Sequence, residues 1–320
     1  MQSFDKYGLN QNLLKSITGL KFDKPTSIQD KVIPKILSSE SDIIASAQTG
    51  TGKTAAFGLP IIHLTDNKNK NIECIILCPT RELCIQITKD LTIFSEHIKH
   101  YKVLPIYGGT KIENQFKGIR TNPKIIVCTP GRLNDLIKRR KLDLSLVKYF
   151  VLDEADEMLS MGFKSEIDKV LNEVPSDRKI YLFSATLSDK VKKITQTYMT
   201  NPLMISTSPV NQGADTVKHI YYVSHKSKRY DIIKNIIDIN ENIYTIVFCR
   251  TRRETKDISK KLIGDNYKAK VLNGDLSQSE RDNVMNQFRS KTINILVATD
   301  VASRGIDVNN LSHIINYNLP

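Results

Sequence analysis

Short runs of β-branched and other apolar residues recur along this chain, and longer segments with helical spacing separate them. In the first two thirds of the chain, these runs occupy residues 42–46, 73–78, 103–106, 125–128, 147–152 and 180–183. Residues 82–98, between two of the runs, carry apolar side chains at helical intervals. Parallel neighbouring strands need a long crossover, which is usually a helix. The alternation therefore predicts an α/β fold in which helices cover both faces of a parallel sheet.

The alternation is interrupted at residues 206–216, which are mostly small and polar and include a proline and a glycine, so we predict a linker there. Beyond it, strands are predicted at residues 218–223, 243–248, 269–272, 293–298 and 313–317. A length of 320 residues suits two domains rather than one or three. We therefore expect a first domain at 1–207, a linker at 208–216 and a second domain at 217–320.

The first predicted strand is followed directly by Ala-Gln-Thr-Gly-Thr-Gly-Lys-Thr, which begins at Ala47. Gly50 and Gly52 allow backbone N–H groups to approach phosphate oxygens. Lys53 can reach the β- and γ-phosphates of a nucleotide, and Thr54 offers a hydroxyl to Mg²⁺. A helix that begins here adds a favourable field for the anion. The segment predicts a nucleoside triphosphate site, although Ala47 stands where the usual pattern has its first glycine.

An acidic tetrapeptide, which runs from Asp153 through Glu154 to Asp156, follows the apolar run at 147–152. One of its carboxylates can hold a hydrated Mg²⁺, and its neighbour can polarise the attacking water. An acidic cluster alone is usually solvated surface, but together with a phosphate loop it predicts hydrolysis of a phosphoanhydride.

Lys and Arg together number 47 and Asp and Glu 34, so the formal net charge is +13. Such an excess predicts attraction to a polyanion such as nucleic acid. Polar clusters directly follow further predicted strands and begin at Pro79, Gly108, Thr129, Ser184, Cys249, Gly274 and Thr299. Because ligands bind at the carboxyl ends of parallel strands, we expect these clusters to share one edge of each sheet.

The five cysteines are an odd and scattered set, and no second Cys-x-x-Cys pair is present. We interpret them as small buried thiols of a reducing compartment rather than as metal ligands: Cys74, Cys78, Cys84, Cys128 and Cys249. No apolar run approaches the roughly 20 residues that cross a bilayer, and the N-terminus is polar. We therefore expect a cytoplasmic protein that does not enter a membrane.

These motifs, in this order, resemble the DEAD-box family of ATP-dependent RNA helicases, in its bacterial type. Asp153 to Asp156 spells the tetrapeptide that gives the family its name, and Ala47 to Thr54 matches the family's phosphate loop. Phe22, together with the segment that ends at Gln29, resembles the part that reads adenine. The resemblance covers essentially the whole chain. It implies two RecA-like domains in tandem that couple ATP binding and hydrolysis to RNA binding and local unwinding.

The resemblance also implies a role for each matching residue. It places catalysis on Lys53, Asp153, Glu154, Ser184 and Thr186. It places ATP binding on Phe22, Thr26, Gln29, Ala47, Gln48, Thr49, Gly50, Thr51, Gly52, Lys53, Thr54, Gly305 and Asp307. It places RNA binding on Pro79, Thr80, Arg81, Gly108, Gly109, Thr129, Pro130, Gly131, Arg132, Gln278, Arg281, Thr299 and Asp300. Mg²⁺ would be held, partly through water, by Thr54 and Asp153.

The family's core continues into a His-Arg-rich motif that supplies arginines to the γ-phosphate, and this sequence stops at Pro320, before such a motif. We therefore expect a second domain truncated at its C-terminus and weak ATP hydrolysis, since such arginines contribute about 10³–10⁵-fold to the rate in related enzymes. The implied partner is single-stranded or short duplex RNA, held through its backbone largely without regard to sequence, by a monomeric protein.

Three other functions stay open at this point. The same motifs would serve an ATP-dependent RNA clamp that separates no strands. They would also serve a helicase that acts on DNA. A P-loop ATPase that binds no nucleic acid agrees least with the net charge of +13.

Overall fold

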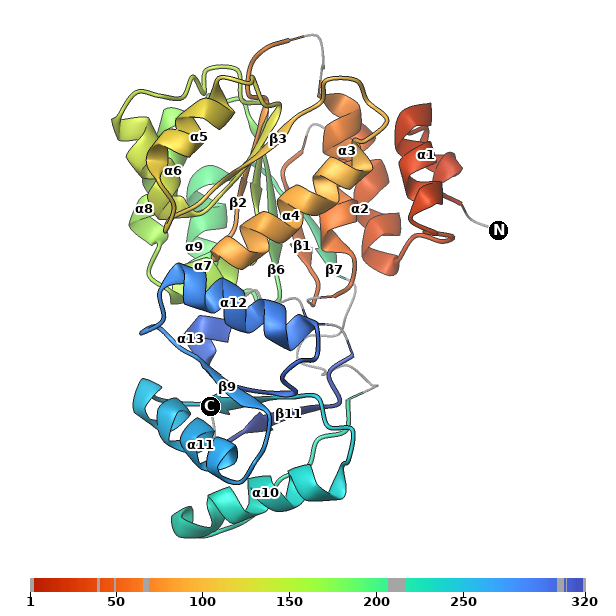
Figure 1. Cartoon of the computed structure of the whole chain (residues 1–320). Helices are drawn as coiled ribbons and strands as arrows, with labels where there is room; N and C mark the ends of the chain where they lie inside the picture. Colours follow the sequence, from red (N-terminus) through yellow and green to blue (C-terminus); the bar gives the residue numbers. More distant parts are fainter. Residues whose placement is uncertain are drawn as a thin grey trace. The chain divides into compact units, whose positions relative to one another are not determined.

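The computed structural model describes residues 3–38, 41–48, 50–65, 69–206, 217–303, 308 and 310–318. The chain divides into two compact units, Met1–Ala214 and Asp215–Pro320 (Figure 1). Each unit is a parallel sheet with helices packed on it, so the α/β fold class is confirmed. The predicted linker at 208–216 lies outside the described residues.

The described residues of the first unit form a sheet of seven strands in the order β3-β4-β2-β5-β6-β1-β7. The strands are β1 (Ile43–Ser46), β2 (Cys74–Leu77), β3 (Val103–Ile106), β4 (Ile125–Cys128), β5 (Tyr149–Leu152), β6 (Lys179–Ser184) and β7 (Leu203–Ser206). Every pairing is parallel, and the six strands predicted for this half are confirmed, β3 and β4 with the predicted ends and the other four with shifted ends. The edge strand β7 was not predicted, because only Ile205 of its four residues is buried.

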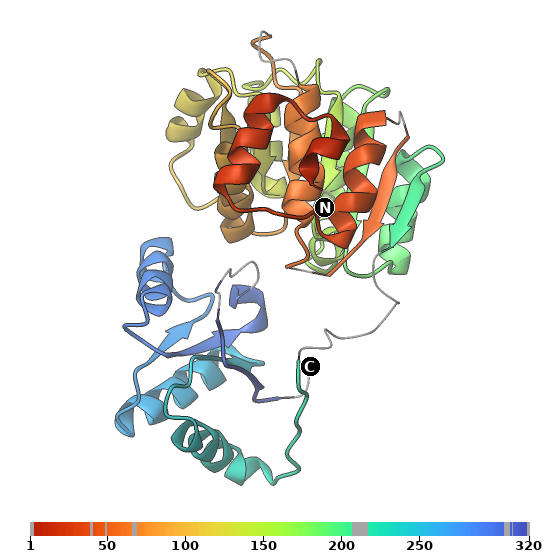
Figure 2. The ribbon, with the colours of Figure 1, turned by 90° about the vertical axis from the view of Figure 1, so that its right-hand side faces the viewer.

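Helices cover both faces of this sheet. They are the short 3₁₀ helix η1 (Phe4–Tyr7) and α1 (Gln11–Gly19), α2 (Ser27–Ser38), α3 (Lys53–Leu64), α4 (Arg81–Phe94), α5 (Ile112–Ile119), α6 (Pro130–Lys138), α7 (Ala155–Ser160), α8 (Lys164–Glu173) and α9 (Asp189–Tyr198). Neighbouring strand residues point to opposite faces, so Ile76 packs with α1–α4 and Ile75 packs with α6–α9. Figure 2 shows α1 and α2 on the first of these faces. Helix α4 ends at Phe94, earlier than the predicted helix at 82–98.

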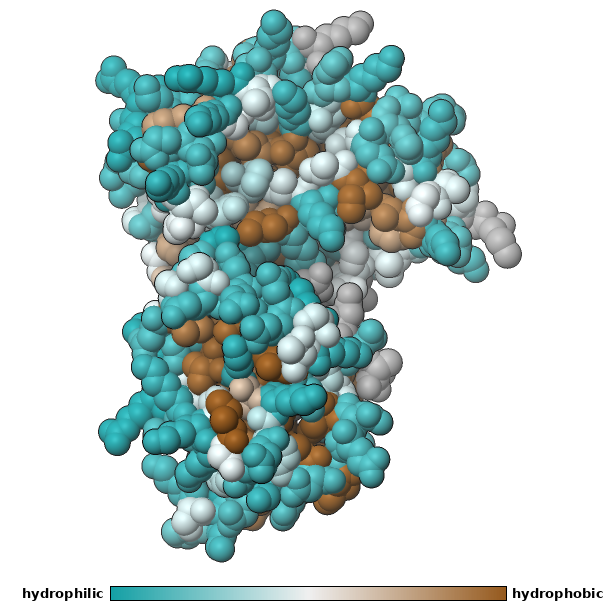
Figure 3. All heavy atoms as spheres, viewed as in Figure 1, coloured by the Kyte–Doolittle hydropathy of each residue, from teal (hydrophilic) through white to brown (hydrophobic). Residues whose placement is uncertain are grey.

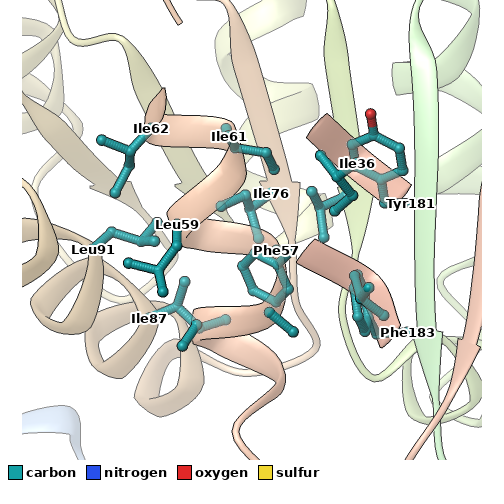
Figure 4. Close-up of a cluster of buried hydrophobic side chains, with 14 of the residues drawn as sticks. Ile36, Phe57, Leu59, Ile61, Ile62, Ile76, Ile87, Leu91, Tyr181 and Phe183 are labelled. Carbon is teal, nitrogen blue, oxygen red and sulfur yellow. The ribbon is translucent and has the colours of Figure 1, made fainter. Parts of the chain in front are cut away.

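Helix α3 is apolar around its whole circumference and is buried accordingly. Its residues Phe57 and Leu59 lie among side chains of α4 and of the strands, including Ile87, Leu91 and Phe183 (Figure 4). Because α3 begins at the end of the predicted phosphate loop, this packing fixes the loop at the carboxyl edge of the sheet.

Gly58 lies where α3 packs against α4. A Cβ at this position would stand 2.4 Å from Leu91 Cδ2, so Gly58→Ala is expected to destabilise the first unit by about 1–3 kcal/mol. Urea denaturation followed by circular dichroism measures the change. The control is Gly19→Ala in α1, where no atom lies within 4 Å and no loss is expected. An unchanged midpoint for Gly58→Ala would contradict the close packing.

Within the described residues of the second unit, four parallel strands pair in the order β11-β8-β10-β9. They are β8 (Thr245–Cys249), β9 (Ala269–Leu272), β10 (Ile295–Thr299) and β11 (His313–Asn316). The helices are the short η2 (Lys226–Lys228) and α10 (Arg229–Ile239), α11 (Arg252–Gly264), α12 (Gln278–Arg289) and α13 (Asp300–Ser303). The strand predicted at 218–223 is wrong, since these described residues form no strand. Their β-branched and aromatic composition favours a strand, but a strand also needs a neighbour whose backbone pairs with it.

All five cysteines are buried free thiols, as predicted. In the described part of the chain, no group of His, Cys, Asp and Glu side chains could hold a metal ion by itself. The helices there are too short or too polar to cross a membrane.

Candidate nucleotide and nucleic-acid site

The predicted polar clusters share one edge of each sheet. All strand pairs are parallel, and in the first unit the clusters follow β1 through β6 at their carboxyl ends. In the second unit they follow β8, β9 and β10 in the same way. This part of the prediction is therefore confirmed, and each unit has one edge on which ligands can gather.

The phosphate loop has the backbone that its chemistry requires. Gly50 has a φ of 77° and Gly52 a φ of 87°, in the left-handed region that favours glycine. The Thr51 hydroxyl donates to the Gln48 carbonyl oxygen at 2.8 Å and closes the turn. Helix α3 begins at Lys53, so the unsatisfied N–H groups of its first turn lie at the end of the loop.

Lys53 connects this loop to the acidic tetrapeptide. Its Nζ donates to the Ala47 carbonyl oxygen at 3.4 Å and lies 4.0 Å from Asp153 Oδ1. The side chains of Lys53 and Asp153 are only 7% and 4% exposed. Burial raises the pKa of Asp153, and the charge of Lys53 opposes that rise. Thr54 follows Lys53 in the first turn of α3, at the same edge of the sheet.

Glu154 occupies a strained position beside this pair. Its φ of 52° and ψ of 51° are left-handed, which is uncommon for a residue other than glycine, and it directly precedes α7 without a side-chain capping hydrogen bond. Burial, and then the charge of Asp153, raise the pKa of Glu154 to about 7. A carboxyl group with this pKa can accept and release a proton near neutral pH, as a general base must.

Asp156 joins the acidic tetrapeptide to the segment after β6. Its Oδ2 accepts hydrogen bonds from the Thr186 backbone N–H at 2.9 Å and from the Thr186 hydroxyl at 2.8 Å. The Ser184 hydroxyl donates to the Thr186 carbonyl oxygen at 2.7 Å and accepts from the Asp156 N–H at 3.3 Å. No role was predicted for Asp156, and no local pattern marks it, because its partners lie some thirty residues away in the chain.

The predicted adenine-reading residues are hydrogen-bonded to the phosphate loop. The Gln29 amide nitrogen donates to the Gly52 carbonyl oxygen at 3.2 Å, and the Thr26 hydroxyl donates to the Thr51 carbonyl oxygen at 2.8 Å. Gln29 Oε1 also accepts from the Thr26 N–H at 2.9 Å. A glutamine amide has two N–H donors and two acceptor lone pairs, so Gln29 keeps one of each for a ligand.

The two aromatic residues near this segment differ in access. Phe22 is 38% exposed and meets the edge of Phe94, with ring centroids 6.4 Å apart. Phe4 is 3% exposed and packs against Tyr7. Phe22 is therefore accessible for stacking, whereas Phe4 belongs to the core.

Gly52→Ala is expected to weaken nucleotide binding by about tenfold or more. Its Cβ would lie 2.4 Å from the Gln29 amide nitrogen, and its φ of 87° strains any side chain by about 1–2 kcal/mol, so the loop must leave its conformation. Titration with a fluorescent ADP analogue measures the loss. Gly8→Ala is the matched control, because its φ is 69° but no atom lies within 4 Å. Equal affinity in the two variants would contradict the contact between Gln29 and the loop.

A cavity of about 570 Å³ opens at the carboxyl edge of the first sheet, among residues that follow β2, β3 and β4. Half of its lining was predicted to contact RNA: Pro79, Arg81, Gly108, Thr129, Gly131 and Arg132. The other half was not predicted: Asn134, Asp135, Lys138, Phe163, Glu166 and Lys169. The second group lies on α6 and at α8, where the sequence shows only the ordinary spacing of an amphipathic helix.

Side-chain contacts hold the walls of this cavity. Arg132 Nη2 donates to the Thr110 carbonyl oxygen at 3.0 Å, and the Arg81 guanidinium lies 4.8 Å from the centre of the Tyr107 ring. The buried Asn134 amide joins α6 to α8, since it donates to the carbonyl oxygens of Pro130 and Glu166. These hydrogen bonds therefore hold α6 and α8 together along the wall of the cavity.

The remaining predicted RNA contacts of this unit lie at turns beside the cavity. Thr80 caps α4, and its hydroxyl accepts from the Leu83 N–H at 3.2 Å. Pro130 is the first residue of α6. Gly109 has a φ of 81°, which favours glycine at that turn.

In the second unit, the predicted RNA contacts lie at the carboxyl ends of the strands or on α12. Gln278 begins α12 and donates to Asp282 Oδ1 at 3.0 Å, and Arg281 donates to the Ala302 carbonyl oxygen at 2.8 Å. Thr299 ends β10 and Asp300 begins α13. Three predicted ATP contacts lie outside the described residues: Thr49, Gly305 and Asp307.

A phosphate loop at the carboxyl edge of a parallel sheet, with an acidic pair beside its lysine, defines the class of P-loop nucleotide-binding proteins. Two family models narrow the class. Residues 26–194 match the DEAD/DEAH box helicase family, and residues 228–320 match the helicase conserved C-terminal domain. The chain belongs to the DEAD/DEAH box helicase family, as the sequence resemblance implied.

Individual relatives agree with this assignment. The ATP-dependent RNA helicase CshA of Listeria monocytogenes is 42% identical over 320 residues, which are 100% of this chain and 61% of the relative. The DEAD-box ATP-dependent RNA helicase CshA of Geobacillus kaustophilus is 41% identical over 320 residues, which are 100% of this chain and 68% of the relative. The chain therefore spans about three fifths to two thirds of the length of these proteins.

Solved structures show the same similarity. Dbp5 of Saccharomyces cerevisiae, bound to RNA and ADP BeF3, is 31% identical with a TM-score of 0.90, and the match covers 100% of this chain and 81% of that one. A DEAD box protein from Methanococcus jannaschii is 43% identical with a TM-score of 0.63, and the match covers 100% and 86%.

Proposed function

We propose that this chain is an RNA-dependent ATPase that couples ATP binding and hydrolysis to RNA binding and to local unwinding of duplex RNA. One observation carries the proposal. The first unit places the Lys53, Asp153 and Glu154 cluster and a cavity lined by Arg81 and Arg132 at the same sheet edge. The first cluster suits a triphosphate and the second suits a polyanionic backbone.

In this proposal, Lys53 contacts the β- and γ-phosphates, and Glu154 accepts the proton of the attacking water. The left-handed backbone at Glu154 turns it out of the line of β5 at the start of α7. Gln29 and Phe22 hold the adenine by hydrogen bonding and stacking, and the hydrogen bond from Gln29 to the loop connects base recognition to phosphate recognition. The other ATP contacts proposed are Thr26, Ala47, Gln48, Thr49, Gly50, Thr51, Gly52, Thr54, Gly305 and Asp307.

We include Mg²⁺ in the proposed site. Proteins usually hold this ion through one or two carboxylates together with substrate phosphates, and the buried Asp153 carboxylate and the Thr54 hydroxyl beside the loop fit that donor set. When bound, the ion would neutralise charge on the phosphate oxygens. The charge of Lys53, 4.0 Å from Asp153, opposes the rise that burial causes in the pKa of Asp153 and so favours the ionised carboxylate that such an ion would need.

Ser184 and Thr186 take part through Asp156. The four hydrogen bonds among them make the segment after β6 and the start of α7 one rigid group. A shift of the acidic tetrapeptide on hydrolysis would therefore move this segment. Because ATP and RNA share the edge that this group occupies, we expect each ligand to strengthen the binding of the other.

We further propose that the protein is a monomer of the cytoplasm that does not enter a membrane. Its domains would be 1–207 and 217–320, joined by a linker at 208–216. RNA would be held by phosphate and sugar contacts, and preference over DNA would come from 2′-hydroxyl contacts.

ATP hydrolysis by this chain, measured with and without single-stranded RNA, tests the proposal. We expect RNA to stimulate turnover and DNA of equal length, at the same salt concentration, to stimulate it less. A short RNA duplex with a labelled strand separates a helicase from an RNA clamp, since only a helicase releases the strand. ATP hydrolysis that RNA does not change would contradict the proposal.

A further inference from the structure

The walls of the cavity in the first unit are two helix faces. Residues three positions apart point to the same side of a helix. Two such stripes face the cavity, one on α6 and one at α8: Arg132, Asp135, Lys138, Phe163, Glu166 and Lys169. Each stripe ends in a lysine, Lys138 on α6 and Lys169 on α8, and both lysines line the cavity.

The acidic residues of the stripes have partners of their own. Asp135 Oδ1 lies 3.7 Å from Arg139 Nε, and Glu166 Oε2 accepts a hydrogen bond from the Ser165 hydroxyl at 2.9 Å. Lys138 and Lys169 are exposed, and no carboxylate in the described part of the chain forms an ion pair with either. The cavity lining therefore has four cations, Arg81, Arg132, Lys138 and Lys169, and two carboxylates, Asp135 and Glu166, so cations are in excess there.

The surface around the cavity suits a polyanion better than an apolar partner. In Figure 3 the surface over α5, α6 and α8 is largely hydrophilic. Two more cations, Arg140 and Lys141, follow Lys138 and Arg139 at the end of α6. The carbonyl groups at this end of a helix repel phosphate, so a phosphate here must be held by the lysine side chains themselves.

The length of α6 sets the distance between the predicted RNA contacts at its start and Lys138 at its end. The helix runs from Pro130 to Lys138, which is about 12 Å at 1.5 Å per residue. A strand whose phosphates contact Thr129 and Arg132 would thus reach Lys138 after a few more nucleotides. The interaction with the lysines is available only to a strand of sufficient length.

We propose that Lys138 and Lys169 form a second phosphate-binding subsite, which holds the backbone of an RNA strand beyond the nucleotides at the start of α6. The inference rests on the proposed RNA function and adds residues that no matching motif includes. The subsite contacts phosphates alone, so it increases affinity for longer strands without reading their sequence.

The test is binding of fluorescently labelled oligouridylates of about 4 to about 16 nucleotides, followed by anisotropy at several salt concentrations with a non-hydrolysable ATP analogue present. For the double variant Lys138→Gln, Lys169→Gln, we expect wild-type affinity on the shortest strands. On the longest strands we expect affinity to fall by about 3–10-fold. The salt slope for long strands should decrease by about 1.4, because each phosphate of a single strand that is neutralised contributes about 0.7 to the slope.

Two control variants accompany the test. Lys15→Gln, Lys102→Gln removes the same charge from exposed positions on α1 and before β3, away from the cavity, and should bind like wild type. Lys138→Arg, Lys169→Arg keeps the charge and should keep the dependence on length.

Two outcomes would overturn the subsite. One is wild-type binding by the double glutamine variant at every length, and the other is an equal decrease in affinity at all lengths. If the wild-type chain bound no oligouridylate of any length, the proposed RNA function would fail, and the subsite would fail with it. The wild-type measurement therefore separates the two failures.

Discussion

Glu154→Gln is expected to slow ATP hydrolysis by about 10²–10⁴-fold, the usual contribution of a general base, while ATP binding stays near the wild-type level. The amide has nearly the same shape as the carboxyl group but cannot accept a proton. The change also removes a carboxyl group whose pKa burial and Asp153 raise to about 7, so we expect folding stability to be unchanged or slightly higher.

Steady-state hydrolysis with saturating RNA measures the rate, and titration with a fluorescent ATP analogue measures binding. The control is Glu157→Gln on the same short helix α7, which alters a carboxyl group three residues further along and should keep most activity. A Glu154→Gln rate within about threefold of wild type would mean that another group activates the water.

Lys53→Met is expected to lower ATP affinity by at least about 100-fold, because it removes a buried cation from the phosphate loop. It also leaves the buried Asp153 carboxylate without the cation 4.0 Å away. Breaking a buried pair costs about 3–5 kcal/mol of folding stability when the geometry is close. Since 4.0 Å is longer than a hydrogen bond, we expect a destabilisation at the lower end of that range or below it.

A double-mutant cycle separates the two effects. In Lys53→Met, Asp153→Asn neither charge remains, so stability should return towards the wild-type value while ATP binding stays weak. Denaturant unfolding and nucleotide titration of the four proteins measure both quantities. If the second substitution restored no stability, the interaction between Lys53 and Asp153 would not contribute to folding stability.

Patterns that are local in the sequence predicted the strands well. Ten of the eleven strand predictions correspond to strands in the described residues, because buried parallel strands are continuous apolar runs bounded by turn residues. The prediction of a strand at 218–223 was wrong, because the presence of a neighbouring strand to pair with is not a property of the local sequence. The edge strand β7 was missed because its residues are mostly exposed and give no apolar run.

The residues that we propose to carry the chemistry could also be identified from local patterns. Lys53 follows glycines that only a tight loop needs, and Asp153 and Glu154 follow a buried strand. The order of strands in the sheet then brought these two segments together, although they lie about a hundred residues apart in the chain. The proximity of these two segments was expected from the parallel topology of the sheet, and neither segment alone predicted it.

The sequence by itself determined the α/β class, the phosphate loop and the acidic tetrapeptide, because glycine conformations, apolar periodicity and charge are properties of short segments. Only the tertiary structure decided that Gln29 supports the loop through Gly52, that Asp156 holds Thr186, and that α8 completes a cavity wall. Each of these depends on which distant backbone and side-chain groups meet once the sheet has formed. A hydrogen bond between segments far apart in the chain produces no periodic pattern in the sequence, so it is found only in the folded structure.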